Sequence, residues 1–408
     1  MATSERARAW MLPASVPGIV LGGVGLLGLG LVAGLVVDPS ALVGTSGYVF
    51  GAGLLLAVGL YGSTYSIDLQ AVRADVRGVV VAVTLGVVLK AALITGVMVL
   101  AFGRPEYLVL GIAVAQIDPL SVAALSRSGR MSPRARSLLA AWASFDDPMT
   151  VLLTLYVAGY AYTKAGHEGT PAVAGGGARG YANGIALNAA LLAGVLLLWW
   201  AGRRAGARMS ASPRARRAGT ALAGLLVVAM LALAAGNMLM LAVAVAGLVV
   251  RTAAFDRTLD RAVGGAFLAA ALALGLFLAQ GVALLPGFVL GVAAFGAQAV
   301  VALGVMPLFV RGLERRDWIA LGLGQQNGIT AILIALTLER DFPGTVSTVG
   351  PAVVTVNVLY GTSHVLLAHS PRLRRTRGRR ELVADDERPS PCEKPPAQEP
   401  LANGRSPA

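Results

Sequence analysis

The sequence predicts an all-α polytopic membrane protein of about 12 transmembrane helices, and three observations lead to this fold class. Of 408 residues, 56% are hydrophobic and 13% are charged, whereas a soluble domain carries about 25% charged residues. Apolar runs long enough to cross a bilayer recur along the whole chain. Lysine and arginine cluster in the segments between these runs. Together these features are typical of a helical protein that spans the membrane many times.

Twelve apolar runs are expected to form the spans. They lie at about residues 16–37, 42–62, 78–101, 107–127, 137–159, 183–201, 217–235, 238–250, 262–284, 286–310, 318–338 and 346–368. The first follows two arginines and is longer than the core of a signal peptide, which predicts an uncleaved helix. The eighth is short enough to tilt little or to be partly re-entrant.

Basic residues lie almost entirely on one side of this arrangement. With the N-terminus inside, the inner segments carry 29 of the 34 lysines and arginines, and the outer loops carry four. The remaining one, Lys90, falls inside the third span. The positive-inside rule therefore predicts an even number of spans, with both termini in the cytosol of a bacterial plasma membrane.

The chain is expected to divide into a transmembrane domain, 1–370, and a cytosolic tail, 371–408. The tail opens with six arginines and then becomes rich in Pro, Glu and Asp, which predicts disorder. The arginines either touch anionic lipid or only stop translocation after the last span, and the second interpretation is favoured. The net charge of +13 thus reflects membrane topology, and no nucleic-acid partner is expected.

Several kinds of site are excluded by residue type. The single cysteine, Cys392, lies in the tail, so no disulfide or cysteine metal site is expected within the chain. There is no HExxH motif, P-loop or zinc spacing, and no nucleophile–base pair. The sequence therefore argues against an enzyme and against an ATP-driven pump, and no cofactor is expected.

Three aspartates lie within the spans, where a charge costs at least ~2.5–3.5 kcal/mol at a helix centre. Asp118 precedes a proline in the fourth span. Proline removes a backbone donor and disfavours helical geometry in the residue before it, so this span is expected to be broken. Irregular backbone at that depth is tolerated where it lines a cavity, and it suits cation binding. The alternative is a simple kink, with Asp118 satisfied by its neighbours.

The other two aspartates are adjacent in the fifth span, in the run Ser144-Phe145-Asp146-Asp147-Pro148. Neighbours on a helix point about 100° apart, so one can face a cavity and the other a neighbouring helix. Burial and a second carboxylate both favour the neutral form of a carboxyl group. Such a group can hold a proton or a cation in turn. The alternative is a polar pair at a helix end.

Span eleven contains three consecutive amides, Gln325, Gln326 and Asn327, bracketed by glycines. Amides can cap helix ends without charge, so this span is also expected to be broken, although small residues can instead form a packing face. Two interruptions in corresponding spans point to an inverted repeat with the site between them. Lys90 is expected to pair with a carboxylate or to be deprotonated, unless a cavity brings water to it.

Taken together, these motifs resemble those of the monovalent cation/proton antiporter superfamily, the sodium/proton exchangers. The resemblance is densest from about residue 60 to residue 160. The segments that carry it are Gly62-Ser63-Thr64-Tyr65-Ser66-Ile67-Asp68-Leu69 with Arg73, Asp118-Pro119 with Val122-Ala123-Ala124-Leu125, Asp146-Asp147-Pro148, and the basic loop from Arg130 to Arg136. Their combined order is specific, whereas Asp-Pro alone is a weak signal.

The resemblance implies inverted repeats, two broken helices that cross at mid-membrane, and a mobile core beside a dimerisation domain. It implies a homodimer that moves its core like an elevator. Asp147 takes the position that binds the cation or the proton in turn. Asp146 takes a position that is Asn in one-for-one exchangers and Asp in electrogenic ones. Asp118 is the carboxylate of the first broken helix, and with Asp147 it is expected to hold the transported metal ion.

Four positions depart from the family pattern. Ile117 replaces a threonine, which leaves only its backbone carbonyl for a cation. Trp142 replaces a glutamate, and Gln298 replaces a lysine or arginine. These two positions usually form an ion pair in the family, and here both are uncharged. Asn327 stands where an arginine is common. Since Asp146 then lacks its usual cationic partner, Lys90 is expected to supply it.

The leading hypothesis is a secondary transporter that exchanges Na⁺, K⁺ or Li⁺ for H⁺, with Asp147 alternating between cation and proton. Asp146 is a candidate for a second proton. Supporting roles are expected for Ile117, Ser144, Lys90, Gln298, Gln325, Gln326 and Asn327. Two alternatives stay open: a Na⁺-coupled solute transporter of the same fold, and a sensor or channel-like member that no longer exchanges.

Overall fold

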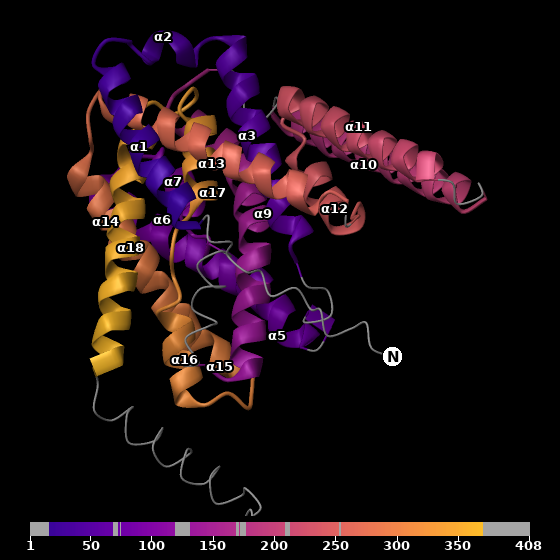
Figure 1. The fold of residues 1–408 in the computed structure, drawn as a ribbon. Helices are drawn as coiled ribbons and strands as arrows, with labels where there is room; N and C mark the ends of the chain where they lie inside the picture. Colours follow the sequence, from indigo (N-terminus) through magenta and orange to yellow (C-terminus); the bar gives the residue numbers. More distant parts are fainter. Residues whose placement is uncertain are drawn as a thin grey trace, which may run out of the picture. The chain divides into compact units, whose positions relative to one another are not determined.

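A computed structural model describes residues 16–67, 72, 73, 75–118, 131–168, 171, 177–208, 213–252 and 254–369. The chain divides into two units, Met1–Tyr360 and Gly361–Ala408, and only the end of one helix is described in the second. Every regular element in the described ranges is a helix (Figure 1), so the all-α fold class is confirmed. The expected tail at 371–408, Asp68, Ser121, Pro119 and Arg130 lie outside the described residues.

The helices follow the apolar runs of the sequence. They are α1 (Val16–Gly34), α2 (Ser40–Val43), α3 (Ser46–Tyr65), α5 (Val76–Val81), η1 (Ala82–Gly86), α6 (Val87–Phe102), α7 (Tyr107–Ala113), α9 (Pro133–Lys164), α10 (Gly177–Arg208), α11 (Pro213–Asn237), α12 (Met240–Val249), α13 (Asp256–Leu278), α14 (Leu284–Val300), η2 (Val301–Val305), α15 (Met306–Phe309), α16 (Arg315–Gly322), α17 (Ile329–Leu338) and α18 (Thr345–His369).

Eight helices of the described chain are long and apolar enough to cross a membrane. Two of them are composite, α5–η1–α6 and α14–η2–α15. Shorter apolar helices lie at Leu21–Gly34, Met240–Val249 and Ile329–Leu338. The protein is therefore a multi-pass membrane protein. The full count of twelve spans, the inverted repeat and the dimerisation domain stay predictions.

α9 is longer than the expected span of residues 137–159 and runs from Pro133 to Lys164. Its start is set by Ser132, whose hydroxyl accepts a hydrogen bond from the backbone N–H of Ala135, and by proline at the first turn. Proline suits this position because its missing N–H would have no partner there. Asp317 at the start of α16 binds both the N–H and the hydroxyl of Ser132. The start of α9 is thus fixed to the start of α16.

α1 and α13 pack at unusually close range (Figure 1). A Cβ atom on Gly30 would overlap the carbonyl oxygen of Leu272, and one on Gly275 would overlap the carbonyl oxygen of Leu27. Small residues let helix backbones approach in a membrane, where packing drives association in place of the hydrophobic effect. These glycines therefore allow the first span to pack closely against a helix that is far away in the sequence.

Two breaks in the helices place backbone groups inside the bundle. α7 ends at Ala113, and residues 115–118 are not helical. α16 ends at Gly322, and α17 begins at Ile329 after a second irregular segment. The expected interruption of span eleven is confirmed, because a described helix lies on each side of its irregular segment. In span four α7 ends well inside the expected span, and the residues after Asp118 lie outside the described part of the chain. α9 packs against α3, α7 and α16, so its aspartates lie beside both breaks.

Candidate functional site

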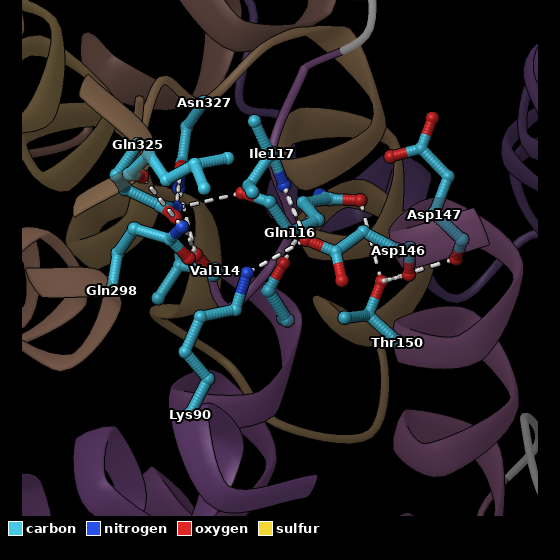
Figure 2. A network of polar contacts seen from close by, with 12 residues as sticks. Lys90, Val114, Gln116, Ile117, Asp146, Asp147, Thr150, Gln298, Gln325 and Asn327 are labelled. Carbon is cyan, nitrogen blue, oxygen red and sulfur yellow. Dashed lines mark hydrogen bonds and ion pairs between the residues drawn. The ribbon is translucent and has the colours of Figure 1, made fainter. Parts of the chain in front are cut away.

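The two irregular segments contact each other directly. The N–H of Asp118 donates to the carbonyl oxygen of Gln326 at 2.8 Å. The side-chain amide of Gln325 donates to the carbonyl of Gln116 at 2.7 Å, and that of Asn327 donates to the carbonyl of Val114 at 3.1 Å. Figure 2 shows these amides reaching the backbone of the first break. The two broken helices thus satisfy each other's carbonyls where water is excluded.

Lys90 and Asp146 form an ion pair inside the bundle. The Lys90 Nζ atom lies 2.6 Å from Asp146 Oδ2, and both side chains are fully buried. The same oxygen accepts a hydrogen bond at 3.0 Å from the N–H of Ile117 in the first break. The Lys90 ammonium also lies 5.3 Å from the centre of the buried Trp142 ring, which is within range of a cation–π interaction. The predicted pairing of Lys90 with Asp146 is therefore present.

Asp147 faces a different environment. Its side chain is 3% exposed, and its Oδ2 atom accepts a hydrogen bond from the Thr330 hydroxyl at 3.1 Å. Its Oδ1 atom is buried as well, and the hydroxyl of Ser63 also interacts with this carboxylate. Figure 2 shows the carboxylates of Asp146 and Asp147 pointing to different sides of α9, as the helical offset predicts. Asp147 forms no ion pair among the described residues, which leaves its charge for a cation or a proton.

Asp118 of the first irregular segment lies against Gly328 of the second. A Cβ atom placed on Gly328 would lie 2.5 Å from the Asp118 Cγ atom. Only a residue without a side chain leaves this room. The Asp118 and Asp147 carboxylates act on each other electrostatically. Asp118, Asp147 and Thr330 thus face one region at the crossing of the broken helices.

The remaining predicted residues differ in their placement. Gln298 is fully buried, and its amide donates to the carbonyl of Leu321, the last turn of α16, at 3.0 Å. Gln326 contributes its backbone carbonyl, and Ile117 contributes its N–H rather than the carbonyl that the sequence suggested. Ser144 donates to the carbonyl of Ala140 on its own helix.

Several site residues had no role assigned from the sequence. Thr330 binds Asp147, and Thr150 donates to the carbonyls of Asp146 and Asp147. Asn357 of α18 donates to the carbonyl of Asn327 at 3.2 Å. Their signal was a polar side chain within an apolar span, but threonine satisfies its own helix so often that type alone does not mark a site. The Ser63 hydroxyl interacts with the Asp147 carboxylate, and Thr154 has a buried hydroxyl oxygen with no partner among the described residues.

The groups that meet beside the irregular segments are carboxylate and hydroxyl oxygens, from Asp118, Asp147 and Thr330. Within the described ranges no group of three or more His, Cys, Asp or Glu side chains converges. Carboxylate, hydroxyl and carbonyl oxygens are the groups that hard cations prefer.

The comparisons with known proteins agree with this geometry. No curated protein sequence matches the chain. The fold is similar to that of the sodium proton antiporter MjNhaP1 from Methanocaldococcus jannaschii at pH 8, with a TM-score of 0.53 and 15% sequence identity over 86% of this chain and 93% of that one. The model of the family described as "Sodium/hydrogen exchanger, transmembrane" matches residues 11–367. The chain therefore belongs to the sodium/hydrogen exchanger family.

Proposed function

We propose that the protein is a secondary transporter that exchanges a monovalent cation for protons, with Na⁺ favoured over K⁺ and Li⁺. The observation that carries this proposal is the buried carboxylate of Asp147, which forms no ion pair among the described residues. A buried carboxylate is stable only when a positive charge neutralises it. A cation and a proton therefore compete for one carboxylate, and that competition couples their movements.

In this proposal Asp147 binds the cation, and Asp118 and Thr330 complete the oxygen ligands. The Lys90–Asp146 pair carries no net charge. It therefore holds the first irregular segment in place without adding to the net charge that the core carries across the membrane. If the pair stays intact, one cation exchanges for one proton and transport is electrically neutral. If Asp146 also takes up a proton as Lys90 leaves it, transport becomes electrogenic.

We further propose that access alternates by an elevator-like shift of the core that contains the crossing, in a homodimer held by a dimerisation domain. The concentration of basic residues on one side of the membrane supports cytosolic termini. No cofactor is needed, because the gradient of one ion drives the other. The partners are the cation, the proton and the lipid bilayer.

The test is proton movement in vesicles that contain the purified protein and a pH-sensitive dye. Adding Na⁺, K⁺ or Li⁺ outside should release protons from acid-loaded vesicles, with Na⁺ most effective. A clamped membrane potential should leave the rate unchanged for one-for-one exchange and should alter it for an electrogenic ratio. Solute-dependent Na⁺ uptake without proton release would instead favour the solute transporter, and cation binding without exchange would favour the sensor.

Replacing Gly328 with alanine should reduce exchange strongly. The new methyl group would lie 2.5 Å from Asp118 Cγ, so either Asp118 or the irregular segment must move, and a misplaced ligand of about 1 Å can cost about 10²-fold. The measure is the initial rate of cation-evoked proton release. Gly96→Ala on α6, where a Cβ atom meets nothing within 4 Å, is the control that should keep the wild-type rate. Equal rates for both variants would contradict the proposed place of Asp118.

A further inference from the structure

A cavity of about 310 Å³ lies between α5, α9 and α15, and none of Asp118, Asp146 and Asp147 lines it. Its lining residues are Asp75, Arg77, Gly78, Arg134, Leu308, Phe309, Val310 and Arg311. Two membrane spans end beside it, because one begins at Val76 and another ends at Phe309. The cavity therefore lies at the depth where a bilayer changes from acyl chains to headgroups.

Positive charge exceeds negative charge in this cavity, which we call the arginine cavity. Arg134 is held in place, since its Nε donates to Asp75 Oδ2 at 2.9 Å and its Nη1 donates to the carbonyl of Arg311 at 2.7 Å. Arg77 and Arg311 are exposed, and neither side chain forms an ion pair within the described chain. Three arginines and one aspartate thus line the cavity, which leaves an excess of two positive charges for an anion.

The same cavity has an apolar side. Leu308 is 73% exposed and Phe309 is 39% exposed, and both belong to the last turn of a span. In a bilayer such side chains contact acyl chains. An anion that meets both the arginines and these residues must carry an anionic group and a hydrocarbon chain on one molecule.

We propose that the arginine cavity binds the headgroup of an anionic phospholipid, with Arg77 and Arg311 on the phosphate oxygens and an acyl chain against Leu308 and Phe309. Guanidinium groups match the geometry of phosphate through paired N–H donors. Basic pockets between membrane helices are suited to anionic headgroups. The lipid would bridge α5, α15 and α9, the helix that carries Asp146 and Asp147.

Native mass spectrometry of the full chain in detergent, titrated with phosphatidylglycerol or phosphatidylcholine, tests the proposal without measuring transport. The wild-type protein should retain phosphatidylglycerol preferentially. The Arg77→Gln/Arg311→Gln variant should bind it about thirtyfold more weakly, which corresponds to ~1 kcal/mol for each arginine. The Arg77→Lys/Arg311→Lys variant should keep the preference, because it keeps the charge.

Arg257→Gln/Arg261→Gln is the matched control, since it removes two exposed arginines from α13 and should leave lipid binding unchanged. Equal loss in this control would mean that overall charge, not the cavity, retains the lipid, and would overturn the proposal. A thermal-shift titration with inorganic phosphate supplies the second arm. Saturable binding of phosphate as tight as that of phosphatidylglycerol would assign the cavity to a soluble anion and would equally overturn it.

Discussion

Replacing Asp147 with asparagine is expected to abolish exchange of cation for proton. The amide keeps the size of the side chain and can still contact Thr330, which bonds to Asp147 Oδ2 at 3.1 Å. It carries no negative charge to neutralise a cation, and it does not take up or release a proton near neutral pH. Cation-evoked proton release in vesicles should therefore fall to the level of vesicles without protein.

The matched control is Asp260→Asn on α13, the same chemical change at an exposed carboxylate, which should leave the rate of exchange as in the wild type. The unfolding temperature of Asp147→Asn should not fall, because a buried charge that forms no ion pair among the described residues is replaced by a neutral group. Full exchange by Asp147→Asn would refute the assigned role of this residue and with it the proposed coupling.

Replacing Lys90 with alanine is expected to produce the largest loss of stability. Lys90 and Asp146 are both fully buried and lie 2.6 Å apart, and removal of one partner strands the other charge at a cost of about 3–5 kcal/mol. The double variant Lys90→Ala/Asp146→Asn should recover much of this loss, because neither charge of the pair is then left without its partner. Thermal unfolding in detergent measures both effects, with the exposed Lys164→Ala as the control.

The same substitution should change transport. Without Lys90, Asp146 must take up a proton or a cation to remain buried, so the pH profile of exchange should shift or activity should be lost. Wild-type stability together with a wild-type pH profile would show that the ion pair has no part in folding or in transport. A shifted profile in Lys164→Ala would show instead that surface charge produces the effect.

The sequence predicted the broken helices from residue types that do not suit a helix in a membrane. Aspartate before proline and three amides between glycines both mark backbone that must leave helical geometry. The partner of Asp146 also followed from charge, because a buried carboxylate in a low dielectric needs a cation and Lys90 was the one basic residue inside a span. These inferences depend on local chemistry and on the bilayer as a solvent.

The sequence did not predict the residue at which the first broken helix stops. α7 already ends at Ala113, several residues before Asp118. The side-chain amides of Gln325 and Asn327 donate hydrogen bonds to the carbonyls of Gln116 and Val114, respectively. The Gln116 amide donates to the carbonyl of Ala113. Partners more than two hundred positions away thus decide where the helix stops, and no local pattern records them.

The π-helical turns were equally hidden. η1 and η2 each place one extra residue in a turn of an apolar helix, at Ala82–Gly86 and Val301–Val305, and they contact each other. Neither segment contains a proline or a charged residue, and the one polar residue, Thr84, only donates to the carbonyl of Val80 on its own helix. Such turns often occur near functional positions, and here they lie between the arginine cavity and the buried Lys90 and Gln298.

The close packing of α1 with α13 has a consequence for the biogenesis of the protein. α1 ends at Gly34 and α13 begins at Asp256, so the ribosome makes more than two hundred residues before the partner of the first span exists. At ~5–20 residues per second this interval lasts roughly 10–45 s. During that time the glycine face of α1 meets only lipid or the insertion machinery. Docking of the first span is therefore a late event in assembly, and a nascent chain that stalls before α13 leaves its earliest helix unanchored.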